Sequence, residues 1–136
     1  MNPTTLEDKF RNSLSNCVFN GRWCLVEKGK LTEEYQEKYT IQGATKSGKD
    51  VWLIYARVQY GGKDLTVPVP VQLKWAGDTP VITLDKVSIP GLGTYSARVL
   101  VYDNTYAGTW SASDHGGMLH GIIERPEASK KPESGI

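Results

Sequence analysis

The sequence has no apolar run long enough to cross a membrane, since no stretch approaches the ~20 residues of a spanning helix. Residues 1–18 also lack the apolar centre of a secretory signal. We therefore expect a soluble chain without a membrane span, cytoplasmic if Met1 is native. A processed secreted or periplasmic form is the alternative.

The sequence also lacks an excess of charge of either sign. Its 16 basic and 15 acidic side chains nearly cancel, and neither sign collects into a block. Proteins that bind nucleic acid or anionic membranes carry a basic surface. We expect neither partner.

Residues that bind metals or attack substrates are scarce. Cys17 and Cys24 are the only cysteines, and they lie on either side of a turn predicted at Asn20–Gly21. Two reduced thiols are the simpler interpretation, and a local disulfide in an oxidising compartment is the alternative. Two cysteines without a suitably spaced histidine pair give no zinc motif, and no nucleophile motif is recognisable. We expect no metal and no cofactor.

The clearest pattern that is present is Leu65–Trp75, where six large apolar residues alternate with polar residues and prolines. This alternation predicts a β-strand with one buried and one exposed face. Residues i and i+2 direct their backbone donors to the same neighbouring strand, so Pro68 and Pro70 remove two donors from one flank. We expect full pairing on the other flank only. The resulting seam, toward the following strand, is also where an oligomer could form.

The rest of the chain predicts one helix and a series of strands. Leu6, Phe10 and Leu14 recur at helical spacing behind a capping sequence that begins at Thr4. Turn residues then recur at short intervals, which is typical of sandwiches and barrels. The predicted strands are residues 22–28, 35–45, 51–60, 65–75, 80–87, 94–102, 105–112 and 118–125.

Eight short-linked strands favour an all-β fold, an eight-stranded up-and-down antiparallel β-barrel with a short N-terminal α-helix covering its closed end. A single domain is expected over residues 1–125, with the helix at about 4–16 and the barrel at about 21–125. Residues 126–136 hold two prolines and no apolar face, which predicts a mobile tail.

Strand direction sorts the aromatic residues into two groups, because alternate turns of a meander lie at opposite ends. Trp23, Trp52 and Trp75 are expected at the end that the helix closes. The opposite mouth would bind a ligand. The predicted ligand-binding residues are Tyr35, Tyr60, Tyr95, Trp110, His115 and Met118.

Three interpretations of function follow. The first is non-catalytic binding of a small apolar or aromatic molecule in the mouth. The second is a structural or protein-interaction module, because a barrel of this size can fill its lumen with side chains. The third is a small enzyme using His115 and Asp114. No catalytic residue is assigned, since Asp114 and His115 lie in a predicted turn and His120 lies within a strand.

Gly21-Arg22-Trp23 resembles the G-x-W signature on the first strand of calycins, which include lipocalins, avidins and intracellular fatty-acid-binding proteins. The resemblance implies a ligand-binding barrel, with Arg125 packed across Trp23 as in lipocalins. The paired prolines also suggest a resemblance to fatty-acid-binding proteins, in which a gap separates the fourth and fifth strands. The segments WAGDTPVI, IPGLGT and YAGTWS resemble those of a group of uncharacterised bacterial proteins, which implies no activity.

Overall fold

The computed structural model describes residues 3–125, apart from the side chains of Pro3, Thr4 and Tyr60. Within this part of the chain the elements are α1 Pro3–Ser13, β1 Cys17–Glu27, β2 Lys30–Leu31, β3 Tyr35–Lys46, β4 Val51–Tyr60, β5 Lys63–Ala76, β6 Thr79–Ile89, β7 Gly93–Tyr102, β8 Thr105–Ser111 and β9 Gly116–Glu124. The predicted tail at residues 126–136 lies outside the described residues. No helix in residues 3–125 is long and apolar enough to span a membrane.

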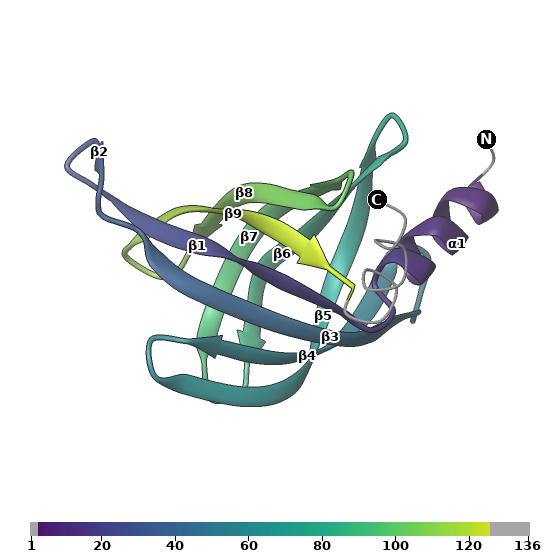
Figure 1. Ribbon diagram of the computed structural model, residues 1–136, viewed down its shortest axis with the longest axis horizontal. Helices are drawn as coiled ribbons and strands as arrows, with labels where there is room; N and C mark the ends of the chain where they lie inside the picture. The colour runs from purple at the N-terminus through teal and green to yellow at the C-terminus, as the bar shows by residue number, and fades with distance from the viewer. Residues whose placement is uncertain (1–2, 126–136) are drawn as a thin grey trace, which may run out of the picture.

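The strands form a closed antiparallel barrel. Strands β3 to β9 pair in chain order, and β1 pairs with both β3 and β9. The β1–β9 pairing closes a barrel of eight strands, and the short β2 pairs only with the end of β1. Figure 1 shows α1 at one end of the barrel and β2 at the other. The predicted fold is therefore confirmed.

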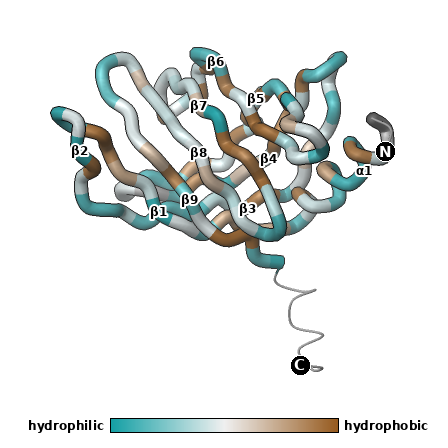
Figure 2. Tube along the Cα trace, turned by 90° about the horizontal axis from the view of Figure 1, so that it is seen from above, coloured by the Kyte–Doolittle hydropathy of each residue, from teal (hydrophilic) through white to brown (hydrophobic). Residues whose placement is uncertain are grey.

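The lumen face follows from strand alternation. In β4, Trp52, Ile54, Ala56 and Val58 are buried, while the residues between them are more exposed. Successive side chains of a strand point to opposite faces, so this row faces inward. Figure 2 shows apolar segments along the strands and hydrophilic residues at the turns.

The start of β1 differs from the prediction. The strand begins at Cys17, and Gly21 lies in its middle, opposite Glu37 of β3 and Gly121 of β9. The expected turn at Asn20–Gly21 is therefore wrong. A Cβ at Gly21 would overlap the backbone of β9 and the hydroxyl of Tyr106. The glycine thus permits close approach inside a sheet, which its sequence neighbours do not distinguish from a turn.

The absence of a turn at Asn20–Gly21 also decides whether the two cysteines can form a disulfide. Cys17 and Cys24 are buried, free and on one continuous strand. Seven residues of extended chain span roughly 23 Å, far more than a disulfide can bridge. A disulfide between these two cysteines is therefore excluded.

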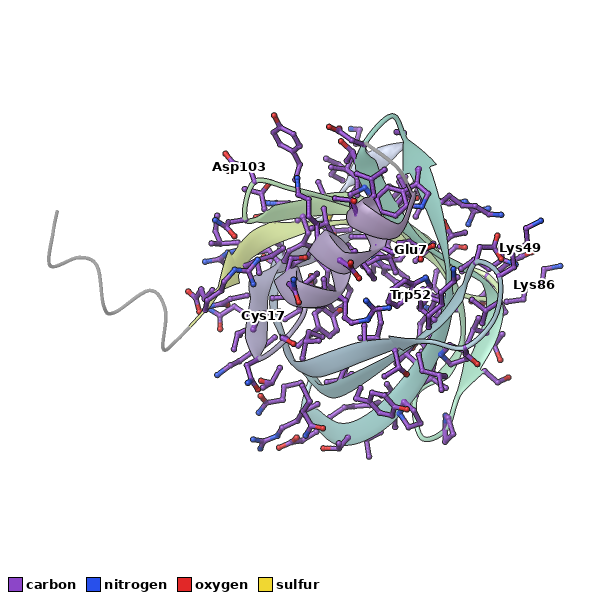
Figure 3. All side chains as sticks on the ribbon, turned by 90° about the vertical axis from the view of Figure 1, so that its right-hand side faces the viewer. Glu7, Cys17, Lys49, Trp52, Lys86 and Asp103 are labelled. Carbon is purple, nitrogen blue, oxygen red and sulfur yellow. The ribbon has the colours of Figure 1, made fainter. Side chains whose placement is uncertain are left out.

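Helix α1 covers the end of the barrel where β1 begins (Figure 3). Phe10 and Leu14 are buried, and the Phe10 and Trp52 rings pack edge to face with 5.1 Å between their centroids. An ion pair of 2.8 Å between Glu7 and Lys46 joins α1 to β3. Trp75 lines a surface depression together with Trp52 and Glu7, so it lies at the same end. The closed end is therefore as predicted, and two of the three tryptophans predicted there, Trp52 and Trp75, lie at it.

Strand β5 pairs unequally with its neighbours. It pairs with β4 from Lys63 to Gln72, but with β6 only from Gln72 to Ala76. The amide of Leu73 donates to the carbonyl of Asp50, on the β4 side. By alternation, Pro68 and Pro70 lack their donors on the β6 side. The predicted seam between these strands is confirmed.

Candidate functional site

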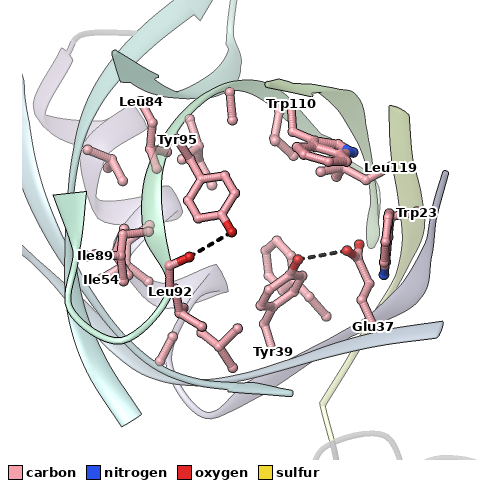
Figure 4. Close-up of a pocket in the computed structure, with 18 of the residues that line it drawn as sticks. Trp23, Glu37, Tyr39, Ile54, Leu84, Ile89, Leu92, Tyr95, Trp110 and Leu119 are labelled. Carbon is pink, nitrogen blue, oxygen red and sulfur yellow. Dashed lines mark hydrogen bonds between the residues drawn. The ribbon is translucent and has the colours of Figure 1, made fainter. Parts of the chain in front are cut away.

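A cavity of about 380 Å³ occupies the barrel lumen away from the helix. Its walls are mostly aliphatic and aromatic side chains from the inward rows of the strands (Figure 4). Among its described lining residues, the ionisable side chains are Glu37, Tyr39, Tyr95, Tyr106 and His115. A volume above about 300 Å³ with few polar groups is typical of small-molecule sites.

Trp110 of β8 is the centre of the aromatic contacts at the mouth. Its ring centroid lies 5.7 Å from that of Trp23, 6.4 Å from that of Tyr95 and 5.5 Å from that of His115. Its indole N–H donates to the carbonyl of Cys24 at 3.3 Å. This bond fixes the indole against β1, so Trp110 presents a preset apolar surface to the cavity.

Three of the six predicted ligand-binding residues line the cavity, namely Tyr95, Trp110 and His115. Tyr35 is outside the lining and packs on Trp23, with 4.9 Å between ring centroids. Tyr60 ends β4, and its side chain lies outside the described part of the chain.

The sixth residue, Met118, points away from the lumen. It is 39% exposed, whereas its neighbour Leu119 lines the cavity. Burial alternates along β9, and the less exposed, inward row is Gly117, Leu119, Gly121 and Ile123. The prediction that Met118 lines the mouth is therefore wrong, because it did not fix which face of this strand is inward.

The placement of Trp23 also differs from the prediction. Trp23 is the seventh residue of β1, about 20 Å from the start of the strand at the closed end. It lines the cavity instead of plugging the barrel. Arg125 donates to the carbonyl of Ser13 at the closed end, beyond reach of Trp23. The expected packing of Arg125 across Trp23 is therefore not formed.

The sequence interpretation missed Glu37, a carboxylate inside the barrel that is only 3% exposed. The hydroxyl of Tyr39 donates to Oε1 at 2.7 Å, and the hydroxyl of Tyr106 donates to Oε2 at 2.8 Å. Figure 4 shows the Tyr39 bond and places Trp23 on the same side of the lumen. We call Glu37, Tyr39 and Tyr106 the Glu37 cluster. The alternation of Tyr35, Glu37, Tyr39 and Ile41 was the available signal, because it puts Glu37 on the inward face.

Burial has the largest effect on the pKa values of Glu37 and Tyr106. It raises the pKa of Glu37, and the hydroxyls of Tyr39 and Tyr106, with the more distant His120, partly offset this. Burial also raises the pKa of Tyr106, and the charge of Glu37 raises it further. Tyr106 therefore stays neutral and continues to donate its hydroxyl proton.

Two glycines shape the space for Tyr106. A Cβ at Gly121 would come within 2.7 Å of its ring, and a Cβ at Gly21 would overlap its hydroxyl. The ring packs on Phe19, with 4.8 Å between centroids. The β1–β9 wall thus holds Tyr106 where its hydroxyl reaches Glu37.

The polar residues of the β8–β9 turn do not form a cluster with other titratable groups. Asp114 pairs with His115 at 2.7 Å in an exposed turn, and the bond from His115 lowers the pKa of Asp114. His120 faces outward and pairs with Glu34 at 3.0 Å. Among the described residues, no group of three or more His, Cys, Asp or Glu side chains could hold a metal ion.

Models of known protein families, curated proteins and solved structures give no match to this chain. What the barrel does is therefore inferred from the cavity itself.

Proposed function

We propose that the protein binds a small, largely apolar molecule in the barrel lumen without changing it chemically. The observation that carries this proposal is the cavity of about 380 Å³, whose walls are mostly aliphatic and aromatic. Closing such a space around a ligand removes apolar surface from water, at roughly 25 cal/mol for each Å². A side-chain-filled barrel would leave no such space.

The mouth favours a flat ligand over a long acyl chain. Trp23, Tyr95 and Trp110 line the same cavity, and the Trp23 and Trp110 rings meet edge to face. Rings held in this way offer large apolar area with little loss of side-chain freedom. We propose that Tyr95 and Trp110 contact the ligand from the sides.

The ligand enters between the β8–β9 turn and the β6–β7 turn. His115 lines the cavity and is also half exposed, so the cavity reaches solvent beside it. Across the mouth, Leu92 lines the cavity and its carbonyl accepts a bond of 2.9 Å from Tyr95. Figure 4 shows this bond across the lumen from the Glu37 side. His115 and Leu92 thus form the rim in this proposal.

We also propose that the barrel is of the calycin type. The G-x-W triplet lies on β1, and the incomplete β5–β6 pairing is similar to the gap in fatty-acid-binding proteins. The position of Arg125 departs from the lipocalin pattern, so the proposal extends to the shape of the site and not to a lipocalin ligand.

Binding is tested by titrating the neutral dye Nile red against the parent, Trp110→Ala and Trp75→Phe. The first variant removes the central mouth ring, and the second alters a tryptophan at the closed end. We expect affinity to fall at least about tenfold, or 1.4 kcal/mol, in Trp110→Ala and to stay nearly constant in Trp75→Phe.

Failure of Nile red and a panel of apolar metabolites to bind the parent at submillimolar concentration would favour the structural or protein-interaction module. Equal losses in both variants would show binding outside the lumen. Turnover of a bound metabolite would favour the enzyme interpretation.

A further inference from the structure

Within the part of the chain that the structure describes, the lumen holds a buried acid, Glu37, with no basic side chain beside it. Both oxygens of Glu37 accept hydroxyl hydrogen bonds, from Tyr39 and from Tyr106. Accepting at both oxygens is the pattern of a carboxylate. Among the described residues that line the cavity, the only basic side chain is His115, which lies at the exposed rim.

An isolated charge in an apolar space is costly unless something compensates it. Two neutral hydroxyls compensate in part, and burial still raises the pKa of Glu37. His120 of β9 acts on Glu37 only from the outer face of the wall, where it is paired with Glu34. A positive charge inside the lumen would remove the remaining cost.

The structure around the carboxylate is specific. Tyr106 reaches Glu37 from β8, on the far side of β1 and β9 from β3. This contact requires glycine at both 21 and 121, because a side chain at either position would collide with Tyr106. If the hydrogen bond served only to join β8 to β3, its acceptor would not need to be a carboxylate that also lines the cavity.

The geometry points to a ligand whose apolar body carries a protonated amine, with the amine held against Glu37 inside the lumen. This inference rests on the proposed function and names the ligand class. A carboxylate accepts at up to four lone-pair positions, so two remain beyond the tyrosine bonds. Trp23 lies on the same side of the lumen as Glu37, and aromatic faces favour ammonium groups.

An anionic ligand is disfavoured, because its charge would lie in the same lumen as Glu37, and the only basic side chain among the described lining residues is His115 at the rim. A neutral apolar ligand of the same shape would fill the cavity but leave the cost of the Glu37 charge in place. Comparing the affinities of an amine, a neutral ligand and an anionic ligand of similar shape therefore tests whether the Glu37 charge selects the ligand.

The test uses three naphthalene derivatives of similar shape: naphthylmethylammonium, ethylnaphthalene and naphthylacetate. Equilibrium dialysis measures the affinity of each for the parent at neutral pH. We expect the amine to bind at least about tenfold more tightly than ethylnaphthalene, and naphthylacetate to bind most weakly.

Glu37→Gln keeps the shape of the side chain and removes its charge. Glu34→Gln is the matched control, since it makes the same change in net charge at an exposed carboxylate bonded to His120. We expect Glu37→Gln to lose the preference for the amine while keeping its affinity for ethylnaphthalene within about threefold. Retained ethylnaphthalene binding also shows that the variant is folded. Glu34→Gln should keep the preference.

A parent that binds ethylnaphthalene more tightly than the amine would overturn this inference and leave the proposed function standing. An amine preference that persists in Glu37→Gln would also overturn it, since another group would then be the counter-charge. If none of the three compounds binds while Nile red does, the site is real but this ligand class is wrong. If Nile red fails as well, the proposed function is wrong.

Discussion

The two halves of the barrel are built by the same strands but filled differently. At the closed end, Phe10, Leu14 and Trp52 are 2%, 0% and 1% exposed. In the other half the same inward rows leave a cavity of about 380 Å³ around Glu37. The helix makes the difference, since its apolar side chains fill one end only. We infer that the closed half supplies stability and the open half binds the ligand.

The largest expected effect is loss of stability in Trp52→Ala. The indole packs against Phe10 and beneath Arg11, so its removal leaves a cavity in a filled region. We expect a loss of about 3 to 5 kcal/mol in the free energy of unfolding. Urea melts followed by circular dichroism measure it without relying on tryptophan fluorescence. Trp110→Ala, beside existing empty space, should cost clearly less, and the reverse order would mean that the halves are wrongly distinguished.

The next effect is expected from Gly21→Ala in the wall of the open half. The added methyl group would overlap the Tyr106 hydroxyl and the backbone of β9, neither of which can move freely. We expect a destabilisation of about 1 to 3 kcal/mol from overpacking. Gly43→Ala is the matched control, because nothing lies within 4 Å of a Cβ at that position. Equal stability of the two variants in denaturant melts would contradict the close packing of Tyr106.

These residues show what the sequence could and could not predict. Alternation and turn residues placed β3 to β9 within a few residues, and Pro68 and Pro70 predicted the seam, because these signals are local. Gly21 was wrongly predicted to lie in a turn, because its neighbours in the sequence do not show that Tyr106 of β8 packs against it. That error moved Trp23 to the wrong end. Tyr95, Trp110 and His115 were found by counting strand directions. The alternation of residues 35–41 places Glu37 on the inward face, but nothing local identifies its partner Tyr106, which is 69 positions away.

A pH-dependent effect of intermediate size is expected from Glu37. Burial raises the pKa of Glu37 in the folded state above the ordinary value of 4.5, which applies to the unfolded chain. At a pH between the unfolded-state pKa and the folded-state pKa, the folded state therefore binds more protons than the unfolded state. The free energy of unfolding of the parent should therefore fall as pH rises from the unfolded-state pKa of Glu37 through its folded-state pKa. Glu37→Gln lacks the titrating group. Its stability relative to the parent should improve as pH rises from below 4.5. Parallel curves for the two proteins would show that the Glu37 carboxyl is solvated.

The smallest effect is expected at the seam. Amides of Leu84–Ile89 that face β5 have no partner there, whereas Val81–Thr83 pair with β5. Hydrogen exchange in the first segment should therefore be faster than in the second. Pro68→Thr with Pro70→Thr restores two donors on this side and should slow exchange in Leu84–Ile89. Unchanged rates would mean that the separation of the strands, and not the missing donors, keeps the seam unpaired.

The central claim is that the open half of the barrel holds a small molecule. Native mass spectrometry of the protein purified from the cells that make it tests this directly. We predict one retained small molecule per chain, largely apolar and carrying an amine, which is lost when the protein unfolds. Only the mass of the bare polypeptide, under conditions that preserve the fold, would contradict the claim.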